Sequence, residues 1–188
     1  MIKKLPIILI AFILFAGVGC EPPDPSVAEN FLQPVEEGKP GPDFLVKDLK
    51  GGFFRLSEHR NEVVMLFFWR MKFKDNTDLL PALEELHQRY QDKGLTVLAV
   101  SAETMHSVTL YAMRDFIEEN GYTFTVIRDV DGIVSEAYRV LRGPSTYVID
   151  SKGVLVFIQQ GPIDWLSEEN VGMIEGLLEE RAEEPEKT

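Results

Sequence analysis

The chain has 188 residues, of which 45% are hydrophobic, so one folded domain is the simplest expectation. Its formal net charge of -12 argues against a nucleic-acid partner, because binding to phosphates needs a basic surface. Cys20 is the only cysteine, so no disulfide can form within the chain and no pair of thiols can cycle between oxidised and reduced states.

The first residues have the pattern of an export signal. Lys3 and Lys4 precede an apolar run from Leu5 to Val18, which at about fourteen residues is short for a membrane-spanning helix. Residues 17–20, Gly-Val-Gly-Cys, resemble the lipobox of bacterial lipoproteins, with Gly17 where leucine is usual. The resemblance implies cleavage before Cys20 and attachment of lipid to Cys20, which anchors the protein in the bacterial envelope. The alternative is an uncleaved amino-terminal anchor helix.

Composition divides the chain into four predicted segments. Residues 1–19 are the signal peptide, 20–37 the lipidated cysteine and a tether rich in proline and acid, 38–178 the folded domain, and 179–188 an acidic disordered tail. Glu21 stands where some diderm bacteria read an aspartate as an inner-membrane retention signal. The outer membrane is therefore favoured if the source is a diderm, with the domain facing the periplasm or the cell surface.

The folded part alternates between strand and helix patterns. Residues 63–69 are a continuous apolar run rich in β-forming residues, which is typical of a strand covered on both faces. Leu79, Leu83 and Leu86 recur at helical spacing, and Pro81 predicts a kink in the second turn of that helix. The predicted elements are a hairpin of residues 44–46 and 53–56, strand 63–69, helix 75–93, strand 95–100, helix 106–119, strand 123–127, helix 133–138, strands 146–150 and 154–158, and helix 167–178.

The order of these elements indicates the architecture. Strand, helix, strand and helix in succession imply parallel strands joined by a right-handed crossover. Residues 151–153 form so short a connection between the last two strands that only an antiparallel hairpin fits. The sequence therefore predicts an α/β fold with a mixed sheet and helices on both faces.

Four stretches of sequence make this prediction more specific. They are GPDFLVKDLKG with RLSEHR, VVMLFFW followed by the helix with Pro81, DVDGIVSEAYRV, and GPSTYVIDSKG. Together they resemble the TlpA-like branch of the thioredoxin fold, the membrane-tethered thiol-disulfide oxidoreductases of the bacterial envelope, which are related to the AhpC/TSA redoxins. The resemblance covers about residues 38–165 and implies a three-layer α/β/α sandwich with an amino-terminal hairpin extension.

The redox cysteines of that family are absent from their positions. In the family, a Cys-x-x-Cys segment opens the first helix, where the helix amino terminus lowers the pKa of the attacking thiol. We aligned residues 68–69 and Pro81 with the family pattern. Phe73 then replaces the attacking cysteine, Asn76 the resolving cysteine, and Leu79 a glutamate that some members use to manage the thiol proton. This combined loss predicts a site without thiol-disulfide or peroxidase activity.

The loop that faces this site is retained. Residues 142–146, Arg-Gly-Pro-Ser-Thr, match the family's glycine-threonine-proline-threonine loop, with Gly143 in place of the threonine. The resemblance implies that Pro144 is cis and that the residue before it offers its backbone to an extended peptide. A purely structural role for Pro144, which completes the turn into its strand, is an equal alternative.

Several cations surround the predicted site, which is unusual on so acidic a chain. Arg70, Lys72 and Lys74 follow the central strand, where Lys72 replaces the family's tryptophan, and Arg139 and Arg142 lie near the facing loop. They predict a small basic patch that attracts a carboxylate or an acidic peptide; the alternative is an ordinary scatter of solvated charge. The candidate binding residues are Lys72, Phe73, Lys74, Asp75, Asn76, Arg142, Gly143 and Pro144.

Neither a metal nor a cofactor is expected. Residues 129–132, Asp-Val-Asp-Gly, resemble part of a calcium loop, but Ile127 stands where an oxygen ligand is needed. A turn before a helix is the favoured interpretation. His59, His87 and His106 do not have the spacing of a metal motif.

Three functions remain open. The leading hypothesis is a lipid-anchored, catalytically silent thioredoxin-like module that binds a peptide or an envelope protein near Phe73 and Pro144. The second is a thiol-disulfide oxidoreductase that works with a cysteine supplied by a partner. The third is a structural spacer in an envelope complex.

Overall fold

The structure is a computed structural model that describes residues 35–103 and 106–183. The predicted signal peptide, Cys20, the tether up to residue 34 and the tail from residue 184 lie outside the described residues. None of the helices within the described ranges has the length and apolar character needed to cross a membrane. Val35 already packs against the core, and Glu37 accepts a hydrogen bond from the Ile158 amide (3.1 Å), so the folded part begins before residue 38.

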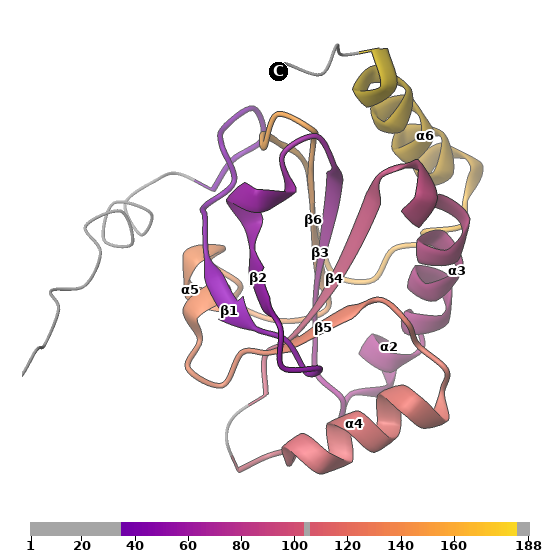
Figure 1. Cartoon of the computed structure of the whole chain (residues 1–188). Helices are drawn as coiled ribbons and strands as arrows, with labels where there is room; N and C mark the ends of the chain where they lie inside the picture. Colours follow the sequence, from indigo (N-terminus) through magenta and orange to yellow (C-terminus); the bar gives the residue numbers. More distant parts are fainter. Residues whose placement is uncertain (1–34, 104–105, 184–188) are drawn as a thin grey trace, which may run out of the picture.

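Five strands form the central sheet (Figure 1). β3 (Val63–Trp69) lies in the middle, between β4 (Leu95–Ser101) and β6 (Ser145–Ile149). β5 (Thr125–Arg128) and β7 (Leu155–Gln160) complete the order β5-β4-β3-β6-β7. The β3-β4 and β4-β5 pairs are parallel, whereas the β3-β6 and β6-β7 pairs are antiparallel. The predicted mixed sheet of an α/β fold is confirmed.

Helices cover both faces of this sheet (Figure 1). The helices α3 (Leu80–Tyr90), α4 (Leu110–Glu119) and α6 (Glu168–Glu183) contribute to the core on one face. The other face is covered by α5 (Ile133–Ala137) and an antiparallel hairpin of β1 (Leu45–Lys47) and β2 (Phe53–Arg55). The remaining elements are α2 (Lys74–Thr77) and the 3-10 turns η1 (Leu56–His59) and η2 (Gln91–Lys93).

The central strand explains why two layers of cover are needed. All seven residues of β3 are buried, and its side chains alternate between the faces. Met65 and Phe67 enter the core beneath α3 and α6, whereas Leu66 and Phe68 enter the core beneath α5 and the hairpin. A strand without a polar face is stable only between two apolar layers.

The predicted helix over residues 75–93 is in fact two helices. α2 ends at Thr77 and α3 begins at Leu80, so Pro81 lies in the first turn of α3 instead of kinking a longer helix. Proline is well tolerated there because first-turn N–H groups have no acceptor within the helix. The helix predicted from residue 106 also begins later, after Thr109, whose Oγ1 accepts a hydrogen bond from Ala112 N (3.1 Å).

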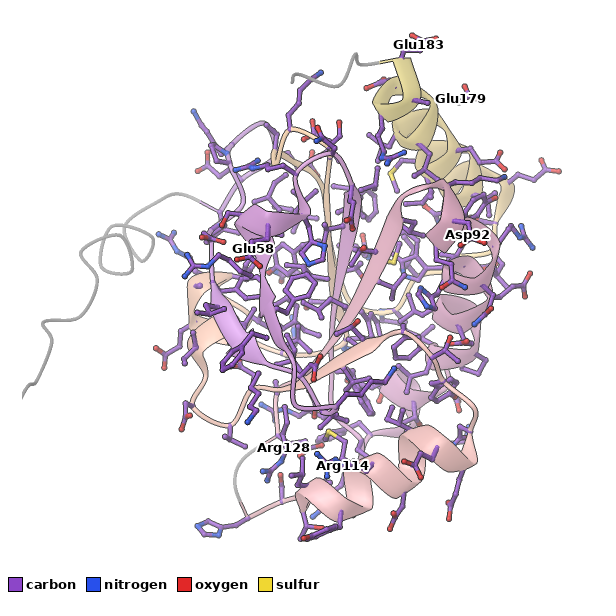
Figure 2. The ribbon with its side chains drawn as sticks, in the orientation of Figure 1. Glu58, Asp92, Arg114, Arg128, Glu179 and Glu183 are labelled. Atoms are coloured by element: carbon purple, nitrogen blue, oxygen red, sulfur yellow. The ribbon has the colours of Figure 1, made fainter. Side chains whose placement is uncertain are left out.

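The last helix continues past its predicted end at residue 178. α6 extends to Glu183, and the side chains of Glu179 and Glu183 project from this end (Figure 2). Arg181 fixes the final turn, because its guanidinium donates hydrogen bonds to the carbonyls of Asn61 and Lys93. Glutamate and arginine are also good helix formers, so the acidic residues up to 183 are helical and not part of a disordered tail.

Two arginines near α4 hold this end of the domain together (Figure 2). Arg114 donates from Nε (3.0 Å) and Nη2 (2.6 Å) to the carbonyl of Leu49 in the hairpin. Arg128 on β5 donates from Nη2 to the carbonyl of Val108 (2.6 Å), just before α4. These bonds join the hairpin, the edge strand and α4 at the end of the sheet where the predicted site lies.

Candidate functional site

The predicted site lies where β3 ends and α2 begins, at the end of the sheet that also carries α4 (Figure 1). Phe73 is the N-cap residue of α2, and its carbonyl accepts hydrogen bonds from the amides of Asn76 (3.0 Å) and Thr77 (3.1 Å). Its side chain is 52% exposed. An exposed aromatic ring therefore occupies the position that the sequence resemblance predicts for the attacking cysteine.

The position that the sequence resemblance predicts for the resolving cysteine holds a buried amide. Asn76 is only 2% exposed. Its Oδ1 accepts a hydrogen bond from the backbone amide of Arg70 (3.1 Å), and its Nδ2 donates to Asp75 Oδ1 (3.0 Å). Both ends of the side-chain amide are thus satisfied, and the bond to Arg70 closes the loop between β3 and α2. Asn76 is a structural residue of the site.

The third change lies directly opposite Asn76. A Cβ atom added to Gly143 would lie 2.8 Å from Asn76 Oδ1 and 3.2 Å from the carbonyl oxygen of Phe68. The family's threonine at this position would therefore collide with Asn76, so the two replacements fit each other. Sequence reasoning noted each replacement but missed their contact. The available signal was that both departures occur together in segments that the fold brings into contact.

The loop before β6 keeps the geometry that the family resemblance implies. The peptide bond between Gly143 and Pro144 is cis. The Pro144 carbonyl accepts a hydrogen bond from Gly161 N (2.8 Å), and Ser145 Oγ donates to the Arg142 carbonyl (2.7 Å). Within the described part of the chain, neither the amide nor the carbonyl of Gly143 has a hydrogen-bond partner. Gly143 itself is partly exposed.

Two buried tyrosines, Tyr138 and Tyr147, precede and follow this loop in the sequence. The Tyr147 hydroxyl donates to the Tyr138 carbonyl, and the Tyr138 hydroxyl donates to the Pro42 carbonyl, both at 3.0 Å. Burial raises the pKa of both phenols, that of Tyr138 well above its usual value. The phenols therefore stay protonated at neutral pH and act as fixed hydrogen-bond donors.

Leu79 occupies the position that the sequence resemblance predicts for the family's glutamate. It is partly buried and packs against the larger core. With Ala82, Ile163 and Trp165 it lines a cavity of about 410 Å3 beside α3. Its apolar side chain cannot carry a proton, so this position retains no acid-base function.

The five cations of the predicted basic patch, Arg70, Lys72, Lys74, Arg139 and Arg142, are all exposed. Lys74 forms an ion pair with Asp78 (Nζ to Oδ1, 2.7 Å), which neutralises its charge locally. Lys72 is exposed, and Arg70 and Arg142 together line a pocket of about 250 Å3 next to Gly143. The structure therefore brings two of the predicted cations to one pocket.

Sequence reasoning missed Glu103. This residue follows β4 and is only 4% exposed. Its Oε1 accepts a hydrogen bond from the Met71 amide (2.7 Å), and its Oε2 accepts one from Ser107 Oγ (2.6 Å). The carboxylate holds the loop that leads to Phe73. The available signal was an acidic residue directly after the apolar run 95–100, at the same sheet end as the site.

The described residues contain no cluster of three His, Cys, Asp or Glu side chains arranged to hold a metal ion. The carboxylate of Asp129 accepts hydrogen bonds from the amides of Val134 (3.1 Å) and Ser135 (2.7 Å). It caps α5, so the interpretation of residues 129–132 as a turn before a helix is confirmed.

Known proteins resemble this chain over most of the folded part. Residues 38–158 match the AhpC/TSA family. Thioredoxin-like protein YneN of Bacillus subtilis strain 168 is 35% identical over 127 residues, which span 68% of this chain and 73% of that protein. Thiol-disulfide oxidoreductase ResA of Geobacillus thermodenitrificans is 34% identical over 148 residues, which span 77% of this chain and 80% of that protein.

Solved structures share the fold at lower identity. The thioredoxin domain of a thiol-disulfide oxidoreductase from Bacteroides vulgatus has a TM-score of 0.63 and 20% identity, and the match covers 76% of this chain and 98% of that domain. A thiol:disulfide interchange protein from Chlorobium tepidum has a TM-score of 0.65 and 14% identity, with coverage of 78% and 99%. The predicted thioredoxin-like fold is confirmed.

Replacing Gly143 by threonine, the family's residue, is expected to lower the free energy of unfolding by about 1–3 kcal/mol, because the new side chain competes with Asn76 Oδ1 for space. The loss should be smaller in an Asn76→Ser background, where the shorter side chain leaves room. Urea unfolding of the four proteins measures this coupling. Equal losses in both backgrounds would contradict the contact.

Proposed function

This chain belongs to the AhpC/TSA family, and we propose that it is a redox-inactive, lipid-anchored thioredoxin-fold protein of the bacterial envelope that binds an extended segment of another protein. One combination of features carries this proposal. Phe73 and Asn76 occupy the positions of the redox cysteines, while Gly143 keeps backbone groups that have no partner among the described residues. The site lacks the groups for thiol chemistry and retains those for binding.

Thiol-disulfide exchange needs a thiolate near a helix amino terminus, where the local field lowers the thiol pKa. Phe73 supplies no sulfur, and the Asn76 amide is committed to hydrogen bonds within its loop. Cys20 lies in the segment that the sequence assigns to the lipid anchor. The names of relatives such as ResA support a second candidate, an oxidoreductase that uses a cysteine of its partner.

The binding role rests on surface chemistry at the same place. Phe73 is 52% exposed, and Leu141 is 87% exposed. Phe73 lies three residues before Asn76 and Leu141 two residues before Gly143, and Asn76 and Gly143 are in contact. Exposed apolar side chains beside an unpaired backbone amide and carbonyl suit strand addition, in which main-chain hydrogen bonds give affinity and side-chain contacts give specificity. An extended segment of a partner protein supplies both.

The anchor is argued from the leader. Residues 1–20 have the charge, the short apolar run and the small residues before Cys20 of a lipoprotein signal. Two or three acyl chains on one residue hold a protein on a membrane without a spanning helix. The acidic and proline-rich residues that follow place the folded domain at a distance from the lipid surface.

The full chain is expected to show only background insulin reduction with dithiothreitol and no peroxide consumption, because no described residue at the site carries a thiol. Turbidity and peroxide assays measure this, with a cysteine-containing thiol-disulfide oxidoreductase as the positive control. Turnover by the wild-type chain that depends on added thiol would contradict the redox-inactive assignment and favour the second candidate.

Replacing Phe73 by aspartate is expected to weaken partner capture from envelope extract by about tenfold or more, because it puts a charge where an apolar contact forms. The matched control is Phe53→Asp, which changes another exposed phenylalanine (72% exposed) on the hairpin. Capture is quantified by mass spectrometry at equal protein loading. Equal capture by both variants and the wild type would contradict binding at Phe73 and favour the structural spacer.

Replacing Cys20 by serine is expected to abolish incorporation of an alkyne-labelled fatty acid and to move the protein from the membrane fraction to the soluble fraction. Intact mass measurement of the wild-type protein checks cleavage before residue 20. If the variant stays on the membrane with Met1 intact, the uncleaved anchor helix is correct and the lipoprotein assignment is wrong.

A further inference from the structure

A polar pocket adjoins Gly143. Its volume is about 250 Å3, and it lies between the ends of β3 and β4, the turn before α5 and the residues before Pro144. The ends of two strands, one turn and one loop thus meet at this pocket. The polar and charged residues among its lining are Arg70, Glu103, Asp129, Ser135, Glu136 and Arg142.

Two of the three acidic residues in this pocket are already satisfied from within the fold. Glu103 accepts hydrogen bonds from the Met71 amide (2.7 Å) and Ser107 Oγ (2.6 Å). Asp129 accepts hydrogen bonds from two backbone amides at the start of α5 (3.1 and 2.7 Å). Both are buried, at 4% and 7% exposure. Their oxygens are therefore committed to holding the pocket walls.

The two arginines of the pocket have no such commitment. Neither Arg70 nor Arg142 forms an ion pair with a carboxylate in the described ranges, although acidic residues outnumber basic ones in the chain by 31 to 19. Both arginines are exposed and line the pocket, and an arginine is the side chain that best complements a carboxylate.

We propose that this pocket binds a carboxylate of the partner segment that pairs with Gly143. The inference rests on the proposed function, because Gly143 belongs both to the pocket lining and to the backbone edge that receives the segment. Side chains of an extended segment alternate between two directions, so one of its residues is directed toward the pocket while its backbone pairs with Gly143. The carboxylate belongs to an acidic side chain or to the end of the partner chain.

Acetate is the probe that isolates this pocket from the rest of the interface. In the full chain labelled with 15N, the side-chain Nε–H signals of Arg70 and Arg142 should shift saturably with acetate and not with acetamide at constant ionic strength. Arg142→Gln should weaken acetate binding by about tenfold. Glu136→Gln, which removes the remaining acid of the pocket, should strengthen it. The matched control is Arg89→Gln on α3, which should leave it unchanged.

Three peptides then distinguish the sources of the carboxylate. They are acetyl-Ala-Ala-Glu-amide, acetyl-Ala-Ala-Ala with a free carboxyl end, and the neutral acetyl-Ala-Ala-Gln-amide. Tighter binding of either acidic peptide in the wild type, lost in Arg142→Gln, supports the pocket and identifies the source. If acetate shifts the Arg89 signal as much as that of Arg142, the pocket proposal is wrong. If partner capture still depends on Phe73 in that case, the proposed function is retained and only the pocket proposal is rejected.

Discussion

The complete burial of β3 is the constraint on which the rest of the structure depends. Seven consecutive residues, Val63–Trp69, are buried with no polar face, so the strand requires neighbours on both edges and apolar layers on both sides. β4 and β6 supply the edges, and the helices and hairpin supply the layers. Because the strand is held so completely, the chain that leaves it at Arg70 has a fixed starting point. The position of the site is therefore set by β3.

From that fixed point, the loop to α2 is held by the polar contacts of two buried side chains. Asn76 accepts the Arg70 amide and Glu103 accepts the Met71 amide, so two successive backbone donors after β3 are bound by buried side chains. A cysteine at position 76 could not form the first of these bonds with the same strength, since sulfur is a weak acceptor. Asn76 therefore holds the loop more firmly than a cysteine would, and Gly143 leaves the space in which the side-chain amide fits.

Much of the fold is predictable because it depends on local pattern. The bounds of β3 follow from its apolar run, and the β6-β7 hairpin follows from the short connection at residues 151–153. The break between α2 and α3 was not predicted, because Asn76 turns inward to a partner that only the folded chain provides. The end of α6 was missed for a similar reason, since Arg181 finds its carbonyl acceptors on two distant segments.

For the site too, local features can be predicted from the sequence, whereas contacts between distant segments cannot. The loss of both cysteines is visible at positions 73 and 76 without any structure. The contact between Asn76 and Gly143 joins residues far apart in the chain. Among the cations, Lys74 pairs with Asp78, whereas Arg70 and Arg142 line one pocket. Composition cannot reveal such pairings, because they are set by the end of the sheet at which each loop emerges.

The form of the loop before β6 is explained either by packing alone or by a binding role. If only packing maintained it, Pro144 and its hydrogen bond from Gly161 would suffice, and the neighbouring surface would be expected to become polar like the rest of an acidic domain. Instead, Phe73 and Leu141 are exposed, and the adjoining pocket is lined by two arginines that form no ion pair within residues 35–103 and 106–183. Exposed apolar groups and unpaired cations both gain stability when a complementary chain covers them. Such groups occur on the segments around Gly143, whose backbone amide and carbonyl have no partner among the described residues. This is the physical argument that the domain binds a partner chain at this site.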